Sequence, residues 1–103
     1  MRFGLKEETI EKINSVFAKF SEVDKVVLYG SRAKGNYKNG SDIDLSLKGN
    51  SLNRDILSKI SIEIDDLLLP YIFDLSVYHQ LNSPDLLEHI NRVGCVFYSK
   101  KGA

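Results

Sequence analysis

The sequence has few features of an oxidising compartment, a membrane or a nucleic-acid surface. Cys95 is its only cysteine, so no disulfide can form within the chain. No apolar run approaches the roughly 20 residues that a membrane-spanning helix needs. Glu7 and Glu8 lie where a secretory signal would require an apolar segment. By elimination, we expect a cytoplasmic protein that does not enter a membrane.

The chain also lacks an excess of charge of either sign. Lys and Arg together number 14, and so do Asp and Glu. General nucleic-acid binding needs a net basic surface that releases counterions from phosphates, so none is expected. The local distribution is uneven, because residues 25–40 contain four basic side chains and no acidic one, and acids resume at Asp42. A small positive loop beside carboxylates suits a polyphosphate next to its metal ion.

The length of 103 residues is enough for one domain with one modest core, so residues 1–103 are expected to form a single domain. Apolar periodicity and turn residues predict the secondary structure. The predicted elements are a helix over 6–20, strands over 25–29 and 42–48, a helix over 51–69, a strand over 71–79, a helix over 84–93 and a final short strand over 95–99. This α-β-β-α-β-α-(β) order predicts an α+β fold, with a small mixed β-sheet packed against helices.

Several predicted boundaries depend on single residues. Ser51 is the expected N-cap of the 51–69 helix, and Pro70 is expected to stop that helix. Ser83 followed by Pro84 is a helix start, and Gly94 is the expected end of the same helix. The short loop between the first two strands predicts that they pair antiparallel, and residues 31–34 are predicted to form a helical turn.

The most informative motif is Asp42-Ile43-Asp44, at the start of the second predicted strand. Residues two apart in a strand point to the same face, so both carboxylates would stand side by side while Ile43 points into the core. Two adjacent carboxylates repel each other and stay ionised most readily when they share a cation. Oxygen ligands with room for water suit Mg²⁺.

Gly30-Ser31 lies a short loop upstream of this motif. A glycine at the end of a strand lets a ligand approach the backbone, and Ser31 offers a hydroxyl and an N–H to a phosphate oxygen. By itself, Gly-Ser is usually only a turn. Residues 30–35 faintly resemble a P-loop, but Asn36-Tyr37 follows where Lys-Ser/Thr is required.

Asp74 is a third acid, and it interrupts the otherwise apolar strand predicted over 71–79. A carboxylate there is costly unless it is paired, bound to a metal or exposed at a strand edge. Considered alone, Asp74 fits exposure about as well as binding. Three acids on neighbouring strands favour a two-metal site for phosphoryl or nucleotidyl transfer. The two histidines are read as peripheral, with His79 at a strand end and His89 on a helix surface.

Gly30-Ser31, ten further residues, Asp42-Ile43-Asp44-Leu45 and a later Asp74 together resemble the nucleotidyltransferase fold of the DNA polymerase β superfamily. The sequence is most similar to the minimal nucleotidyltransferase (MNT) proteins of prokaryotes. This resemblance implies that Asp42, Asp44 and Asp74 are catalytic and bind Mg²⁺, with two ions expected. It further implies that ATP is the substrate that donates AMP. The implied nucleotide-binding residues are Gly30, Ser31, Arg32 and Lys34.

The resemblance also implies a partner. Small members of this family are often encoded beside a HEPN-domain protein and act as its antitoxin, transferring AMP to it. We therefore expect a hetero-oligomer with a HEPN-domain toxin. Larger relatives hold the acceptor in a second domain, and none follows here, so the acceptor is expected to be a protein or to need another subunit.

Three alternatives remain open from the sequence. The chain could be a nucleotide-binding subunit that neutralises its partner by contact alone. It could be a small-molecule nucleotidyltransferase of the antibiotic-modifying kind, which the missing acceptor domain disfavours. It could also be a small α+β domain whose acids are all surface residues.

Overall fold

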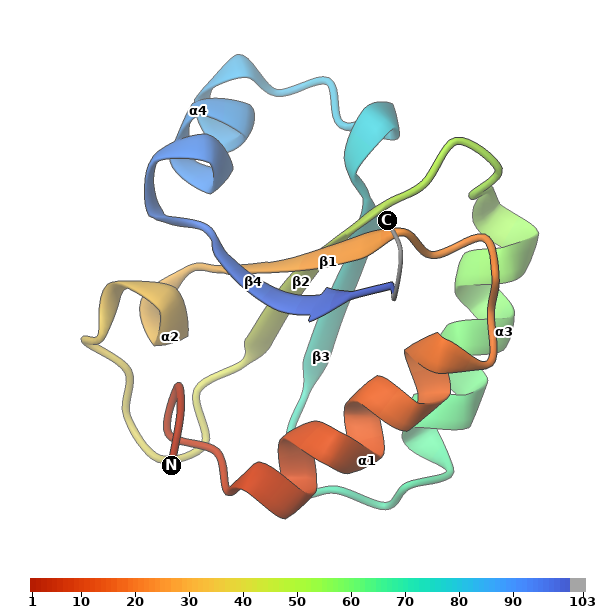
Figure 1. Ribbon diagram of the computed structural model, residues 1–103. Helices are drawn as coiled ribbons and strands as arrows, with labels where there is room; N and C mark the ends of the chain where they lie inside the picture. Colours follow the sequence, from red (N-terminus) through yellow and green to blue (C-terminus); the bar gives the residue numbers. More distant parts are fainter. Residues whose placement is uncertain (101–103) are drawn as a thin grey trace.

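A four-stranded sheet lies at the centre of the structure, a computed structural model that describes residues 1–100. The strands, in the spatial order β3-β2-β1-β4, are β3 (Phe73–Val77), β2 (Ile43–Lys48), β1 (Lys25–Tyr29) and β4 (Cys95–Ser99) (Figure 1). β1 pairs antiparallel with β2 and β4, whereas β2 pairs parallel with β3. The predicted mixed sheet and the antiparallel first pair are confirmed. Residues 101–103 of the predicted domain lie outside the described residues.

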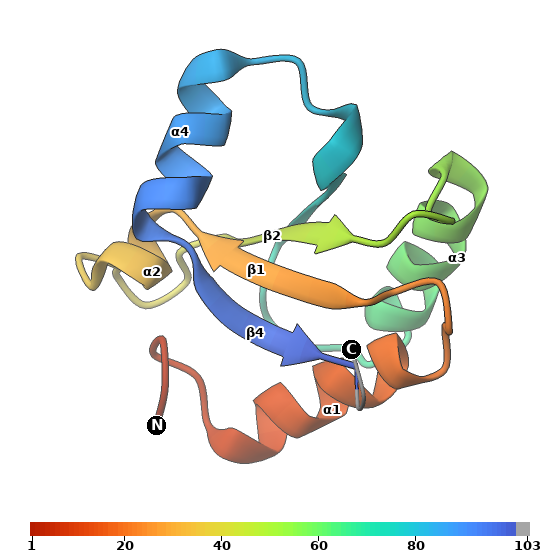
Figure 2. The ribbon, with the colours of Figure 1, turned by 45° about the horizontal axis from the view of Figure 1, so that its top comes forward.

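Helices cover both faces of this sheet (Figure 2). α1 (Glu7–Ala18) and α3 (Arg54–Asp65) pack on one face, where Val26 and Leu28 of β1 join the main core. α4 (Pro84–Val93) packs on the other face, where Ile90 contacts Val27 and Tyr29. Alternate β1 residues thus serve two cores, as the two-residue strand period requires. None of the helices in residues 1–100 is long and apolar enough to cross a bilayer.

Local sequence signals located several elements correctly. β1 has the predicted bounds, and α2 (Ser31–Lys34) forms the suggested helical turn. Ser83 caps α4 by accepting a hydrogen bond from the Leu86 N–H at 3.3 Å, with Pro84 in the first turn and Gly94 as the C-cap. The last strand is also present. In each case, residues close in sequence determine the boundary.

The prediction that Ser51 caps the 51–69 helix is wrong. α3 begins at Arg54, because Asn53 is its N-cap and its Oδ1 accepts a hydrogen bond from the Ile56 N–H at 2.9 Å. Before it, the Leu52 N–H donates to the Gly49 carbonyl in a turn, which buries Leu52 without helix. Both Ser51 and Asn53 are good capping residues, and the tertiary burial of Leu52 selects the second.

The end of that helix was also predicted too late. α3 stops at Asp65, four residues before Leu69, rather than at Pro70. Leu67 and Leu68 donate to carbonyls three residues back, and Leu68 adopts a φ of 56°. Leu68, which the predicted helix included, is 88% exposed.

β3 is shorter than the predicted 71–79 strand. It pairs with β2 from Phe73 to Val77, and Tyr78–Gln80 form a short 3₁₀ helix, η1. Because α3 carries the chain across the sheet, β2 and β3 run parallel and begin at the same end of the sheet. Acids near the start of both strands are thereby brought to one place.

Candidate active site

A row of three polar side chains crosses the first three strands of the sheet. Asp44 on β2 is the register partner of Asp74 on β3 and also of Tyr29 on β1. Register partners on adjacent strands, about 4.8 Å apart, present their side chains to the same face. This is the α4 face, so the row stands opposite the main core. Asp74 is exposed, Asp44 is half-buried and Tyr29 is buried.

Asp42 lies immediately before β2 and is exposed. Burial raises the pKa of Asp44, and the negative charges of Asp74 and Asp42 raise it further. Both acids therefore act on Asp44 electrostatically, and both disfavour its ionised form. A cation beside Asp44 would remove this repulsion.

Tyr29 is affected by the same charges. Burial raises the pKa of its phenol, the neighbouring Ser76 hydroxyl opposes the shift, and the charges of Asp74 and Asp44 add to it. The phenol therefore stays protonated across the neutral range and can donate a hydrogen bond near the acids. Sequence analysis assigned Tyr29 only to a strand.

Gly30 connects this row to the following turn. Its backbone has φ 75° and ψ −155°, a region that is essentially restricted to glycine. A Cβ at this position would overlap the Asp44 carboxylate. Two separate features therefore require a glycine at this position. One is its backbone conformation, and the other is the close approach of the Asp44 side chain.

α2 follows Gly30 directly and contains three of the predicted nucleotide-binding residues, which lie in different environments. Ser31 begins α2 beside Gly30, and Lys34 is exposed on its last turn. Arg32 is not brought to the carboxylates, because it is only 3% exposed and its guanidinium donates to two backbone carbonyls. Its Nη1 lies 2.7 Å from the Phe3 oxygen, and its Nη2 lies 2.9 Å from the Ser41 oxygen.

Two aromatic rings complete the surroundings of Arg32. Its guanidinium carbon lies 5.4 Å from the ring centroid of Tyr37 and 5.1 Å from that of Tyr71. Both distances are within the range of cation–π attraction. Arg32 therefore ties the N-terminal segment, the 35–42 loop and the segment before β3 together.

His89 is a site neighbour that sequence analysis missed, and its assignment to the helix surface is wrong. It is half-buried, and its Nε2 accepts a hydrogen bond from the Gly30 N–H at 3.2 Å. Its ring meets Tyr29 edge-on, with centroids 6.1 Å apart. The apolar stripe of α4 contains Leu86 and Ile90, three before and one after His89, which was the available hint that His89 borders the packed face.

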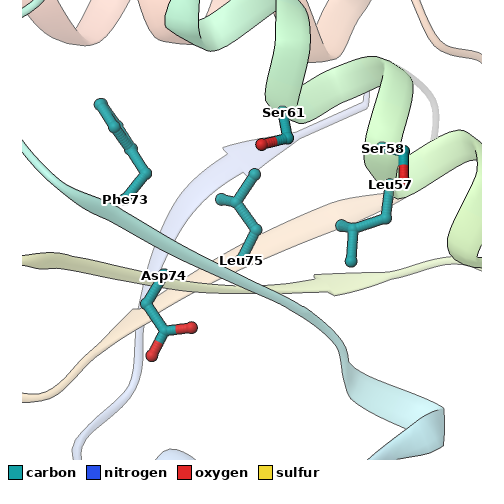
Figure 3. Close-up of a pocket in the computed structure, with 6 residues that line it drawn as sticks. All are labelled: Leu57, Ser58, Ser61, Phe73, Asp74 and Leu75. Carbon is teal, nitrogen blue, oxygen red and sulfur yellow. The ribbon is translucent and has the colours of Figure 1, made fainter.

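An open pocket of about 340 Å³ lies at the β3 edge, beneath α3. Figure 3 shows Phe73 and Leu75 pointing toward α3, with Ser58 and Ser61 above them, while the Asp74 side chain points the other way. The pocket is therefore on the main-core side of β3. The carboxylates of Asp44 and Asp74 face the opposite side of the sheet.

Comparison with known proteins identifies the family of this fold. The sequence model of a family described as "Polymerase beta, Nucleotidyltransferase" matches residues 11–103. The chain belongs to the polymerase beta nucleotidyltransferase family. No curated protein is significantly similar to it in sequence.

Solved structures share the polymerase beta nucleotidyltransferase fold. One is a toxin–antitoxin structure with AMP-PNP, at a TM-score of 0.69 and 19% identity over 94% of this chain and 76% of that chain. A second, from Shewanella oneidensis, is a tri-AMPylated HEPN toxin in complex with an MNT antitoxin, at 0.67 and 15% identity over 94% and 75%. A nucleotidyltransferase candidate from Sulfolobus solfataricus aligns at 0.59 and 19% identity over 94% and 82%. Such identities establish a common fold only.

The carboxylates of this nucleotidyltransferase domain do not by themselves enclose a metal ion. No three Asp, Glu, His or Cys side chains within residues 1–100 come close enough to enclose a metal ion. Mg²⁺, however, usually binds through one or two carboxylates, water and substrate phosphates rather than in an all-protein cage. The paired strands of Asp44 and Asp74, with a raised Asp44 pKa, offer such an incomplete oxygen site.

Replacing Gly30 with alanine tests the tight turn beside Asp44. We expect Gly30→Ala to lower the free energy of unfolding by about 1–3 kcal/mol for the backbone alone, with a further loss from the overlap with the carboxylate. The matched control is Gly35→Ala, where φ is also positive at 86° but an added Cβ meets nothing within 4 Å. Urea denaturation of both variants measures the difference. Equal losses would show that the Asp44 approach imposes no constraint.

Proposed function

We propose that this domain is a Mg²⁺-dependent nucleotidyltransferase that moves AMP from ATP to a hydroxyl of a HEPN-domain toxin and thereby acts as an antitoxin. The observation that carries the proposal is the register pairing of Asp44 with Asp74 on one face of the sheet, next to Gly30. Family membership supports nucleotidyl transfer. Structural relatives in toxin–antitoxin complexes, one with AMP-PNP and one with an AMPylated toxin, support the donor and the acceptor.

Asp42, Asp44 and Asp74 would hold Mg²⁺, with two ions expected. Bound there, the metal supplies positive charge that stabilises the phosphate oxygens during transfer. Asp44, flanked by the other two acids, would be the ligand shared by the site. Its unfavourable ionisation in the folded protein is the physical reason to expect a strong response to a divalent cation.

The turn after β1 would hold the triphosphate. Ser31 offers its hydroxyl, and the first N–H groups of α2 have no carbonyl partner within the helix. The exposed ammonium of Lys34 would neutralise phosphate charge from solvent. Arg32 would act indirectly by holding the loop, because its guanidinium is already occupied by the Phe3 and Ser41 carbonyls.

Asp74, which is exposed on the edge strand β3, would face the acceptor, as the family resemblance implies. In the proposed reaction, Asp74 accepts the proton of the acceptor hydroxyl. The hydroxyl oxygen forms a bond to the α-phosphorus, the bond from that phosphorus to the bridging oxygen breaks, and pyrophosphate leaves. General-base assistance of this kind contributes about 10²–10⁴-fold.

The direct test is incubation of the chain with labelled ATP, Mg²⁺ and the product of the neighbouring gene. We expect the partner to gain the mass of one or more AMP groups, with pyrophosphate released in equal amount. Chelation of divalent cations should stop the transfer. A partner whose mass does not change under conditions where the two proteins bind would remove the enzymatic proposal.

A triple variant separates catalysis from neutralisation by contact. We expect Asp42/Asp44/Asp74→Asn to bind the partner in a pull-down but neither to AMPylate it nor to restore growth of cells expressing it. The three side chains keep their size, so the loss would come from charge. Growth restored by the triple variant would show instead that contact alone silences the toxin.

A further inference from the structure

His89 links α4 to the turn that carries the proposed phosphate ligands. α4 packs across Val27 and Tyr29 through Ile90, and His89 precedes Ile90 on the same helix. The His89 ring is half-buried against Tyr29, with ring centroids 6.1 Å apart and planes at 82°. Packing of α4 therefore places the imidazole at the end of β1.

The hydrogen bond that His89 makes defines its chemical state. The Gly30 N–H donates to Nε2 at 3.2 Å, so Nε2 must carry a lone pair. In a neutral imidazole with an accepting Nε2, the proton is on Nδ1. An imidazolium has no acceptor and could not make this contact. A phenylalanine in place of His89 would keep an aromatic ring but would have no lone pair to accept the hydrogen bond.

The peptide group that His89 holds is the one that sets the turn. Gly30 has a backbone conformation that is essentially restricted to glycine. The position that a Cβ would occupy on Gly30 faces the Asp44 carboxylate. Glycine also has the largest conformational freedom to lose. A hydrogen bond to its N–H removes part of that freedom and keeps Ser31, the next residue, in one place relative to Asp44.

We propose that His89 is a positioning residue of the active site, which fixes the Gly30 peptide through Nε2 and thereby pre-arranges the Gly30–Ser31 turn for the triphosphate of a nucleotide. This inference rests on the proposed nucleotidyltransferase function. His89 touches neither the phosphates nor the reacting atoms. Its contribution is to reduce the ordering cost of nucleotide binding, so its loss raises KM and the dissociation constant more than it lowers kcat.

Two substitutions and a matched control test this role. We expect His89→Phe to weaken binding of Mg²⁺–AMP-PNP, measured by calorimetry, by about tenfold, the effect of about one hydrogen bond. His89→Gln, whose side-chain oxygen can accept from the Gly30 N–H, should stay within about threefold of the wild type. His79→Phe, at the exposed histidine of η1, should have no effect. KM for ATP should follow the same order, with kcat changed less.

Two measurements on the nucleotide-free protein keep the test valid if a variant folds poorly. Nitrogen NMR of wild-type His89 should show the proton on Nδ1, and a proton on Nε2 would overturn the proposal. Exchange of the Gly30 amide should be faster in His89→Phe than in His89→Gln. If the wild type binds and transfers AMP while His89→Phe binds AMP-PNP equally well, only the His89 inference fails. If the wild type binds no nucleotide, the proposed function itself fails.

Discussion

We expect Asp44→Asn to lower kcat/KM for the proposed AMP transfer by about 10³-fold or more, because it removes one of the three carboxylates proposed to hold Mg²⁺. A metal ion at such a site is worth several kcal/mol of transition-state charge stabilisation, and each 1.36 kcal/mol corresponds to tenfold in rate. Transfer of labelled AMP to the partner under single-turnover conditions measures the loss. The amide keeps the size of the side chain, so the structure around Gly30 is preserved.

The same variant should be more stable than the wild type in the absence of metal. The pKa of Asp44 is raised in the folded protein above its ordinary value of 3.8. At a pH between the pKa of Asp44 in the unfolded chain and its raised pKa in the folded protein, the folded state binds more protons than the unfolded state. The free energy of unfolding therefore falls as the pH rises through this range, and it stays lower at neutral pH. The substituted amide has no charge to desolvate, so Asp44→Asn raises Tm at pH 7. Below both pKa values this electrostatic contribution disappears.

Asp65→Asn is the matched control, because Asp65 is an exposed acid at the end of α3. It should leave both the transfer rate and Tm unchanged. Mg²⁺ with a nucleotide should raise the Tm of the wild type and of Asp65→Asn, but not that of Asp44→Asn. Full transfer activity in Asp44→Asn would eliminate the proposed enzymatic function.

Arg32→Ala destabilises the domain by about 3 kcal/mol or more, the largest stability effect that we expect from a polar side chain here. It leaves the Phe3 and Ser41 carbonyls without their charged donor and removes two cation–π contacts. For a domain of this size, Tm should fall by more than about 12 °C. Thermal unfolding without nucleotide measures the effect.

Lys34→Ala provides the matched control for Arg32, because Lys34 is a basic residue of the same helix α2 but is exposed. It should leave Tm unchanged and raise KM for ATP several-fold. Arg32→Lys should recover only part of the lost stability, since an ammonium cannot reproduce the forked donor geometry. A stable Arg32→Ala protein with impaired ATP binding would instead restore Arg32 as a phosphate ligand.

The fold was predictable where residues near in sequence decide it. The β1 run ends at Gly30 because a glycine can adopt the turn, and Ser83-Pro84 starts α4 through a local cap. The limits of α3 were not predictable, because Ser51 and Asn53 are both suitable caps and only burial of Leu52 distinguishes them. The roles of the candidate site residues stay predictions that the experiments above test.

The sequence alone determined that two acids lie two positions apart at the start of a strand and that Gly30-Ser31 precedes them, because both patterns are local. Only the tertiary structure decided which other groups meet them. The parallel register of β2 and β3 sets Asp74 beside Asp44, α4 packing brings His89 to Gly30, and burial withdraws Arg32 from solvent. The physical reason is that register and burial depend on contacts between distant segments, which no local pattern of residue types records.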